Sequence, residues 1–189
     1  MAFRTIHSEI VYQGRAFNVR RDEVELPNKN ITLLDIIEHV GAVTLLPLDD
    51  EGQIWFVRQY RHASGQELLE LPAGTLEPGE RPEECARREA REEIGMAAGK
   101  IQKLGEFFLA PGYSTEYMHV YLLTDLRPDP LKGDDDEFLR VEQIKVEQVY
   151  PMVWQGLIRD AKSLAALMLA RPLLSLPHSS RRGSPGGPD

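Results

Sequence analysis

The chain has 189 residues, which suits one domain, or one domain with an appended subdomain. With 42% hydrophobic and 28% charged residues, it can form a core as ordinary globular proteins do. A formal net charge of −8 argues against a nonspecific nucleic-acid binder, which needs a basic surface, and a single cysteine excludes an internal disulfide.

The N-terminus shows no apolar segment behind positive charge, so we expect no signal peptide. The most apolar late stretch, Leu157 to Leu176, contains four charged residues and lacks the pattern of a membrane span. We therefore expect a cytoplasmic protein that has neither a membrane nor a nucleic acid as its partner.

Residues 8–39 are predicted to form a small β-meander. Apolar and polar residues alternate imperfectly there, and Pro27 to Asn30 is a cluster typical of a turn. Such a sheet has little material to cover both of its faces, so it is stable only when it packs on something. Arg20 in this region is a candidate substrate contact, and the alternative is a solvated charge on an edge strand.

Residues 41–48 and 54–60 predict two further strands, joined by a turn at residues 49–52. The second strand leads into Arg61, and Arg58 precedes it by three positions. An arginine at a strand end can bind a metal-bound diphosphate through two parallel hydrogen bonds, which lysine does less well. Arg61 is the first candidate for phosphate binding and Arg58 the second, with a structural salt bridge as the alternative.

The segment from Pro82 to Ile94 is predicted to be a helix. Proline suits the first helical turn, and the residues after it favour helix. Ala86, Ala90 and Ile94 recur every four residues and mark the buried face, and Gly95 ends the helix. Arg81 stands at the N-cap, where serine or threonine is more usual, so this end is expected to fray more readily.

Three glutamates gather on this predicted helix. Glu89 and Glu93 are four residues apart and project together, and Glu92 lies one step round. Like charges on one face repel each other, but a hard divalent cation such as Mg²⁺ removes that cost because it prefers oxygen ligands. The alternative is a solvated acidic face.

After the helix, residues 101–109 and 117–123 predict strands on either side of a loop at 110–116 that contains Gly112 and Glu116. Glu116 is a candidate for holding metal-bound water, and an exposed loop acid is the alternative. A polar loop follows at 128–136 and, further on, two helices at 146–156 and 160–170. Residues 175–189 have the composition of a disordered tail.

The acidic helix carries a family resemblance. From Gly74 to Gly95 the chain reads G, five residues, E, seven residues, R-E, two residues, E-E, one residue, G, which resembles the Nudix box at every charged and glycine position. The resemblance implies an α+β fold, namely an α/β/α sandwich with a mixed sheet between helices. It also implies Mg²⁺-dependent hydrolysis of a nucleoside diphosphate linked to another group, with Mn²⁺ as a possible substitute. The implied metal ligands are Glu89, Glu92, Glu93, the Ala73 carbonyl, and Glu77 or Glu80.

Outside the box, the chain resembles the ADP-ribose pyrophosphatase subgroup. Residues 57–61 read V-x-Q-Y-R, residues 69–74 read L-E-x-P-A-G, and Pro111 falls sixteen positions after Gly95. This likeness implies that residues 1–39 form an antiparallel subdomain that makes a homodimer and completes the partner's substrate site. The Nudix domain would span residues 40–174, and Gly112 and Glu116 would lie in a loop that positions substrate. The catalytic base would be Glu137, with Asp136 and Asp135 as substitutes, acting with Glu92 and Glu93.

The leading hypothesis is therefore hydrolysis of ADP-ribose to AMP and ribose 5-phosphate. Its rivals are another nucleoside diphosphate sugar such as GDP-mannose, a flavin dinucleotide such as FAD, and a nucleotide-sensing module without catalysis. The last rival fits less well because all the carboxylates of the box are present.

Overall fold

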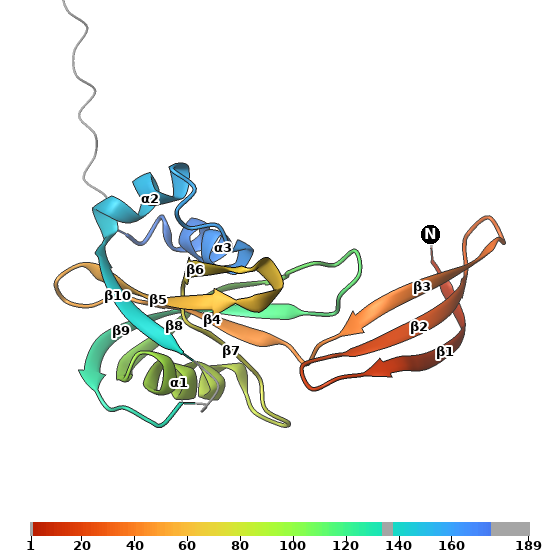
Figure 1. The fold of residues 1–189 in the computed structure, drawn as a ribbon, viewed down its shortest axis with the longest axis horizontal. Coiled ribbons are helices and arrows are strands. Elements are labelled where there is room, and N and C mark those ends of the chain that lie inside the picture. Colours follow the sequence, from red (N-terminus) through yellow and green to blue (C-terminus); the bar gives the residue numbers. More distant parts are fainter. Residues whose placement is uncertain (1, 134–137, 175–189) are drawn as a thin grey trace, which may run out of the picture.

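The computed structural model describes residues 2–133 and 138–174 of the chain. Figure 1 shows a main body and an N-terminal sheet that projects from it. In chain order the elements are β1 (Arg4–Gln13), β2 (Asn18–Glu25), β3 (Ile31–Glu38), β4 (Ala42–Pro47), β5 (Gln53–Arg61), the 3-10 turn η1 (His62–Ser64), β6 (Gln66–Glu70), β7 (Ala73–Thr75), α1 (Pro82–Glu93), β8 (Met96–Phe108), β9 (Tyr117–Pro128), β10 (Leu139–Lys145), α2 (Val146–Trp154) and α3 (Ala161–Ala170).

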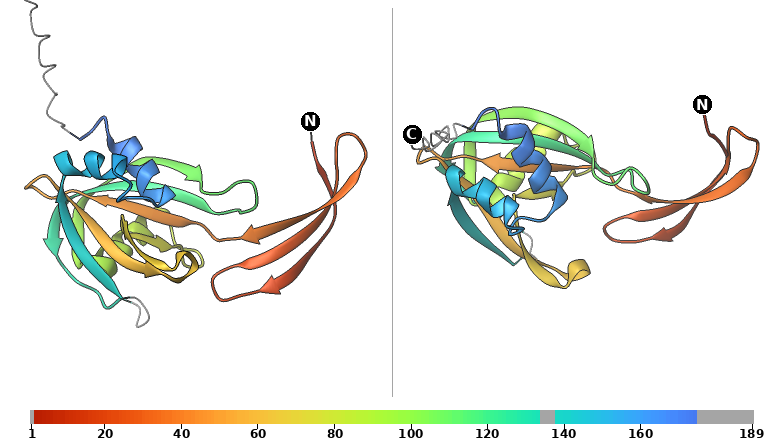
Figure 2. Two further views of the ribbon diagram at one scale, coloured as in Figure 1. Left: turned by 45° about the horizontal axis from the view of Figure 1, so that its top comes forward. Right: turned by 90° about the horizontal axis from the view of Figure 1, so that it is seen from above.

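Two sheets make up the β layer of the body. One has the strand order β7-β4-β9-β8, in which β4 and β9 run parallel and the other neighbours run antiparallel. The other has the order β10-β5-β6 and is antiparallel throughout. Helix α1 lies on one side of this layer and α2 and α3 lie on the other, as Figures 1 and 2 show. The predicted α/β/α sandwich is confirmed.

Two hydrophobic clusters hold these layers together. Cys85, Ala86 and Ala90 of α1 are fully buried against strand residues that include Val43 and Leu123. On the opposite side, a larger cluster joins the sheets to α2 and α3. The inner face predicted for α1 is therefore confirmed, and its small side chains leave the helix backbone close to β4 and β7.

The N-terminus of α1 has a cap that the sequence pattern did not reveal. The Glu84 carboxylate accepts a hydrogen bond from the Arg81 backbone N–H at 3.2 Å and another from its guanidinium at 2.7 Å. Glutamate at the third helical position thus satisfies the backbone N–H of the N-cap residue, as it does in a capping box. This contact opposes the fraying expected from arginine at the cap.

Strand boundaries differ from the predicted ones. Strand β8 begins at Met96, five residues before the predicted start, and β9 continues to Pro128 rather than ending at Leu123. Strands β6 and β7 were not predicted at all. Each is short and is held by pairing with a longer strand, β6 with the strand β5 that precedes it and β7 with β4.

The N-terminal strands β1, β2 and β3 form a separate antiparallel sheet, as the meander predicted. Figure 2 shows this sheet reaching away from the body in both views. It is joined to the body by the loop before β9: the Ile37 N–H donates to the Tyr113 carbonyl at 2.8 Å, and the Thr115 N–H donates to the Ile37 carbonyl at 2.9 Å. The division of the chain at residues 39 and 174 stays a prediction, and the predicted tail lies outside the described residues.

Candidate active site

A cavity of about 680 Å³ opens between α1, β7 and the start of α3. Its wall includes acidic side chains from the Nudix-like segment on one side and two cationic side chains on the other. The charged residues that line it are Arg61, Glu70, Glu77, Arg88, Glu89, Glu92, Glu116 and Lys162.

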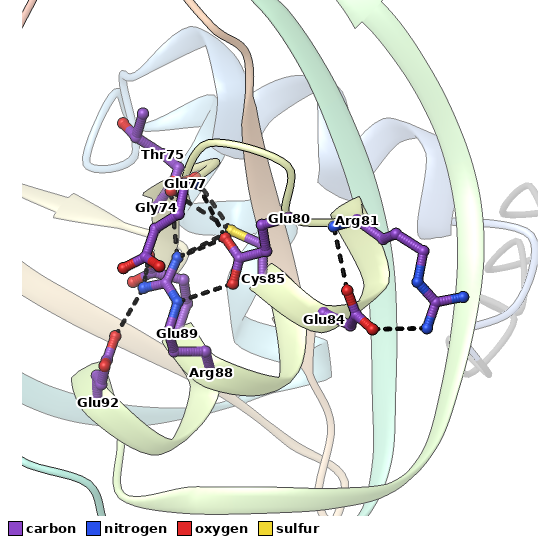
Figure 3. A network of polar contacts seen from close by, with 10 residues as sticks. All are labelled: Gly74, Thr75, Glu77, Glu80, Arg81, Glu84, Cys85, Arg88, Glu89 and Glu92. Carbon is purple, nitrogen blue, oxygen red and sulfur yellow. Dashed lines mark hydrogen bonds and ion pairs between the residues drawn. The ribbon is translucent and has the colours of Figure 1, made fainter.

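Strand β7 and helix α1 approach each other most closely at Gly74. A Cβ at this position would lie 1.8 Å from the carboxyl carbon of Glu89, a distance that no pair of non-bonded atoms tolerates. Glycine is therefore required here so that the Glu89 carboxylate can lie against the strand. Figure 3 shows this carboxylate between Gly74 and Arg88.

Arg88 links the carboxylates of the acidic cluster. Its Nε and Nη2 atoms each donate to Glu80 at 2.9 Å, and its Nη1 atom donates to Glu89 at 2.7 Å and to Glu92 at 2.9 Å (Figure 3). One guanidinium thus offsets the repulsion among three carboxylates. The same contact lowers the pKa of Glu80 to about 2 and raises the pKa of Arg88.

Glu93 is as well buried as Glu89, but it lies outside the cavity lining. Its side chain is buried, and its carboxylate accepts the Ala73 N–H at 3.0 Å. It does not line the cavity, whereas Ala73, Glu77, Glu89 and Glu92 do. The structure therefore brings four of the five predicted metal ligands to one cavity wall and places Glu93 directly behind it.

The opposite wall is organised by a buried carboxylate, Glu70. Arg61 forms two parallel hydrogen bonds with it, from Nε at 2.9 Å and from Nη2 at 2.7 Å. Lys162 also donates to Glu70, and to Asp160 at 2.9 Å. Burial alone would raise the pKa of Glu70, but the bonds from Arg61 and Lys162 outweigh burial and the pKa lies below its ordinary value.

The remaining predicted site residues are dispersed. Arg58 forms two hydrogen bonds with Glu142 on β10, at 2.7 and 3.1 Å, and does not line the cavity. Arg20 lies in the N-terminal sheet. There it donates to Asp22 at 2.9 Å and also contacts Glu38.

In the loop before β9, Glu116 lines the cavity and Gly112 does not. A Cβ added at Gly112 would meet no atom within 4 Å, so the backbone there is open. The predicted base Glu137 and its substitutes Asp136 and Asp135 lie outside the described residues.

Sequence reasoning missed two charged residues of the cavity wall. Glu70 belongs to the L-E-x-P-A-G segment, yet its part in holding Arg61 could be found only from the pairing of β5 with β6. Lys162 is 92 positions from Glu70, and nothing in the local pattern of α3 marks it.

The donor set can be tested against a divalent metal. Among residues 2–133 and 138–174, no three His, Cys, Asp or Glu side chains stand ready to hold a metal ion as they lie. The Glu89 and Glu92 carboxylates accept hydrogen bonds from Arg88 instead. The chemistry of the set nevertheless fits Mg²⁺, because carboxylate oxygens line the cavity and a hard cation prefers oxygen ligands.

The NUDIX domain model matches residues 38–167, and the Nucleoside diphosphate sugar hydrolase N-terminal domain matches residues 3–32. The first match covers more than half of the chain, so the protein belongs to the Nudix family. Members of this family generally use divalent metal ions such as Mg²⁺.

Within that family, the chain is similar to the ADP-ribose pyrophosphatase of Bacillus subtilis, with 36% identity over 87% of this chain and 90% of the relative. It is 47% identical to the ADP-ribose pyrophosphatase of Mycobacterium tuberculosis over 66% of this chain and 61% of that protein. A crystal structure of an ADP compounds hydrolase superposes with a TM-score of 0.83 and 26% identity, over 92% of this chain and 95% of the other.

The protein is therefore a Nudix hydrolase, similar to the ADP-ribose pyrophosphatase subgroup. Hydrolysis of nucleoside diphosphate derivatives is its class of reaction. None of its helices within the described ranges has the length and apolar character needed to cross a membrane.

Proposed function

We propose that this protein hydrolyses ADP-ribose to AMP and ribose 5-phosphate in a Mg²⁺-dependent reaction. One observation carries the proposal: a single cavity has Glu77, Glu89 and Glu92 on one wall and Arg61 with Lys162 on the other. A diphosphate with bound divalent cations presents the same pairing of charges, because its metal ions seek carboxylates and its oxygens seek cations.

Each part of the wall has a chemical role in this proposal. Glu89, Glu92 and Glu93, with the Ala73 carbonyl and Glu77, would hold Mg²⁺, which when bound polarises phosphorus and lowers the pKa of water. The Glu93 carboxylate also accepts the Ala73 N–H and so fixes the start of β7. Arg61 would offset charge that develops on the phosphoryl oxygens. Glu137 stays the proposed base, which removes the proton of the attacking water.

Substrate choice among nucleoside diphosphate derivatives is tested by comparing kcat/KM for ADP-ribose, GDP-mannose and FAD, with products separated by chromatography. We expect ADP-ribose to give the highest value and to yield AMP and ribose 5-phosphate. A strong preference for the guanine substrate would overturn the assignment. Saturable ADP-ribose binding in Mg²⁺ without any product would instead identify a nucleotide-sensing module.

We also propose that the N-terminal sheet pairs two copies of the chain. Every residue of β1 is exposed, and large apolar side chains of the sheet face solvent, with Ile10 50% and Leu33 61% exposed. A three-stranded sheet with uncovered faces needs a partner surface to be stable. A second copy of the chain presents the same surface, so the two sheets can pair about a two-fold axis.

The dimer is tested by light scattering at micromolar concentration. We expect the wild type to have twice the mass of one chain and Leu33→Glu to shift toward one chain. Leu173→Glu is the matched control, because Leu173 is 50% exposed but lies after α3 in the body. A wild-type monomer would contradict the proposal.

A further inference from the structure

Lys162 occupies a position in the cavity that the family resemblance does not explain. It is the second residue of α3, its side chain is 13% exposed, and it lines the cavity beside Arg61. A lysine amino group this well covered needs acceptors nearby, because burial otherwise disfavours its charge.

The first turn of α3 is fixed to the strand segment that forms the cavity wall. The Leu71 N–H donates to the Ser163 hydroxyl at 2.7 Å, and this contact is buried. The Asp160 carboxylate caps the helix by accepting the Ser163 N–H at 3.0 Å. The direction of α3 is therefore set by the same stretch of chain that continues into Ala73 and Gly74.

The four charged groups of this wall have no net charge, and they leave one N–H donor of Lys162 available. Glu70 and Asp160 supply two negative charges, and Arg61 and Lys162 supply two positive ones. Arg61 alone already satisfies both oxygens of Glu70 through its paired hydrogen bonds. A lysine ammonium has three donors, and the contacts with Glu70 and Asp160 take two of them.

We propose that Lys162 is a second anion-binding residue of the cavity, which donates to diphosphate oxygens beside Arg61. Glu70 is a positioning residue that holds the two cations at a fixed separation. The inference rests on the proposed function, because it assigns a contact within the same substrate site. Arg61 recognises the anion by its planar geometry, and Lys162 adds a compact charge from another element of the fold.

The test is equilibrium binding of α,β-methylene-ADP, a diphosphate that resists hydrolysis, in buffer with Mg²⁺. We expect Lys162→Met to weaken its binding about tenfold, because a hydrogen bond between charged groups is lost. Binding of adenosine, which carries no phosphate, should not change. Lys100→Met is the matched control, because Lys100 is 76% exposed, pairs with Asp125 on the outside of β9 and does not line the cavity.

A purely structural lysine predicts another result. Lys162→Met would then lower the melting temperature but bind α,β-methylene-ADP as tightly as the wild type, and this outcome would overturn the proposal. Should Lys162→Met not fold, Glu70→Gln and Glu70→Gln/Lys162→Met provide the comparison, since the double variant removes the charge of Glu70 together with that of its lysine. We expect a tenfold difference between these two variants as well, and equal affinities would refute the role.

Turnover of ADP-ribose by the wild type separates this inference from the proposed function. A wild type that does not hydrolyse ADP-ribose, while Lys162→Met still loses affinity for the diphosphate, would overturn the function and support the anion-binding role. An active wild type whose affinity is unchanged by Lys162→Met would overturn the anion-binding role alone.

Discussion

Replacing Gly74 with alanine should move the Glu89 carboxylate from its place beside β7 without unfolding the protein. The new Cβ would lie 1.8 Å from the carboxyl carbon and from Oε1 of Glu89, and 2.4 Å from Oε2. The end of a glutamate side chain can rotate away into other staggered conformations, so the carboxylate yields before the backbone does. Gly74 does not have a positive φ, so alanine introduces no backbone strain there.

The expected cost in stability is small. The displaced carboxylate loses the 2.7 Å hydrogen bond from Arg88, and such a loss costs about 1–2 kcal/mol. Alanine restricts the unfolded chain and recovers about 0.4–1 kcal/mol. Because 1 kcal/mol moves the melting temperature by about 2–4 °C in a chain of this size, Tm should fall by no more than about 6 °C.

The expected cost in activity is large. Loss of a group that supports a metal site lowers activity by 10–100-fold, and Glu89 is a proposed ligand rather than a supporting group. The kcat for ADP-ribose in Mg²⁺ should therefore fall by at least about 100-fold.

Thermal unfolding and steady-state kinetics on the same sample separate the two effects. Gly133→Ala is the steric control, because its Cβ would lie 3.5 Å from the Glu92 carbonyl oxygen, an ordinary contact. Near-normal kcat in Gly74→Ala would refute the reasoning, since the carboxylate would then not be needed beside β7.

Three further results are expected. Glu93→Gln should keep the fold, because its amide oxygen still accepts the Ala73 N–H, and should lower kcat by orders of magnitude; near-normal turnover would remove Glu93 from the catalytic group. Acid should destabilise the protein through Glu80, whose pKa is lowered from 4.5 to about 2 by Arg88. This stabilisation is fully present above the unfolded pKa and is lost as pH falls through the folded one, so Glu80→Gln should flatten the pH dependence of denaturant unfolding between about pH 5 and pH 2. An unchanged slope would argue against that pair. Mg²⁺ added to EDTA-treated protein should raise Tm in a saturable way that Glu92→Gln weakens, whereas a Tm independent of Mg²⁺ would count against the metal site.

Local signals made helix α1 predictable. Pro82 sets the first turn, Ala86 and Ala90 set the buried face, and Gly95 ends the helix with a φ of 69°. These signals all act within a few residues, so the sequence contains them directly. The requirement for glycine at position 74 was visible as part of the motif, but its steric reason depends on the approach of α1 to β7.

Pairing between distant segments was not predictable in the same way. The V-x-Q-Y-R segment offers two arginines, and spacing alone does not show that Arg58 lies opposite β10 while Arg61 reaches Glu70. Strands β6 and β7 are five and three residues long and owe their form to their partners β5 and β4. Lys162 enters the cavity only because α3 packs against the end of β6, a contact that no local pattern encodes.

The joint between the N-terminal sheet and the body is made largely of main-chain groups. Ile37 exchanges backbone hydrogen bonds with Tyr113 and Thr115, and the Thr115 hydroxyl accepts the His39 N–H at 2.9 Å. Glu116, the next residue, lies in the cavity wall. Backbone hydrogen bonds do not depend on the identity of the side chains. The sequence along β3 can therefore vary while the N-terminal sheet keeps its position against the body. Substitutions in the projecting sheet could then change the geometry of the proposed dimer while the acidic wall of the cavity keeps its place.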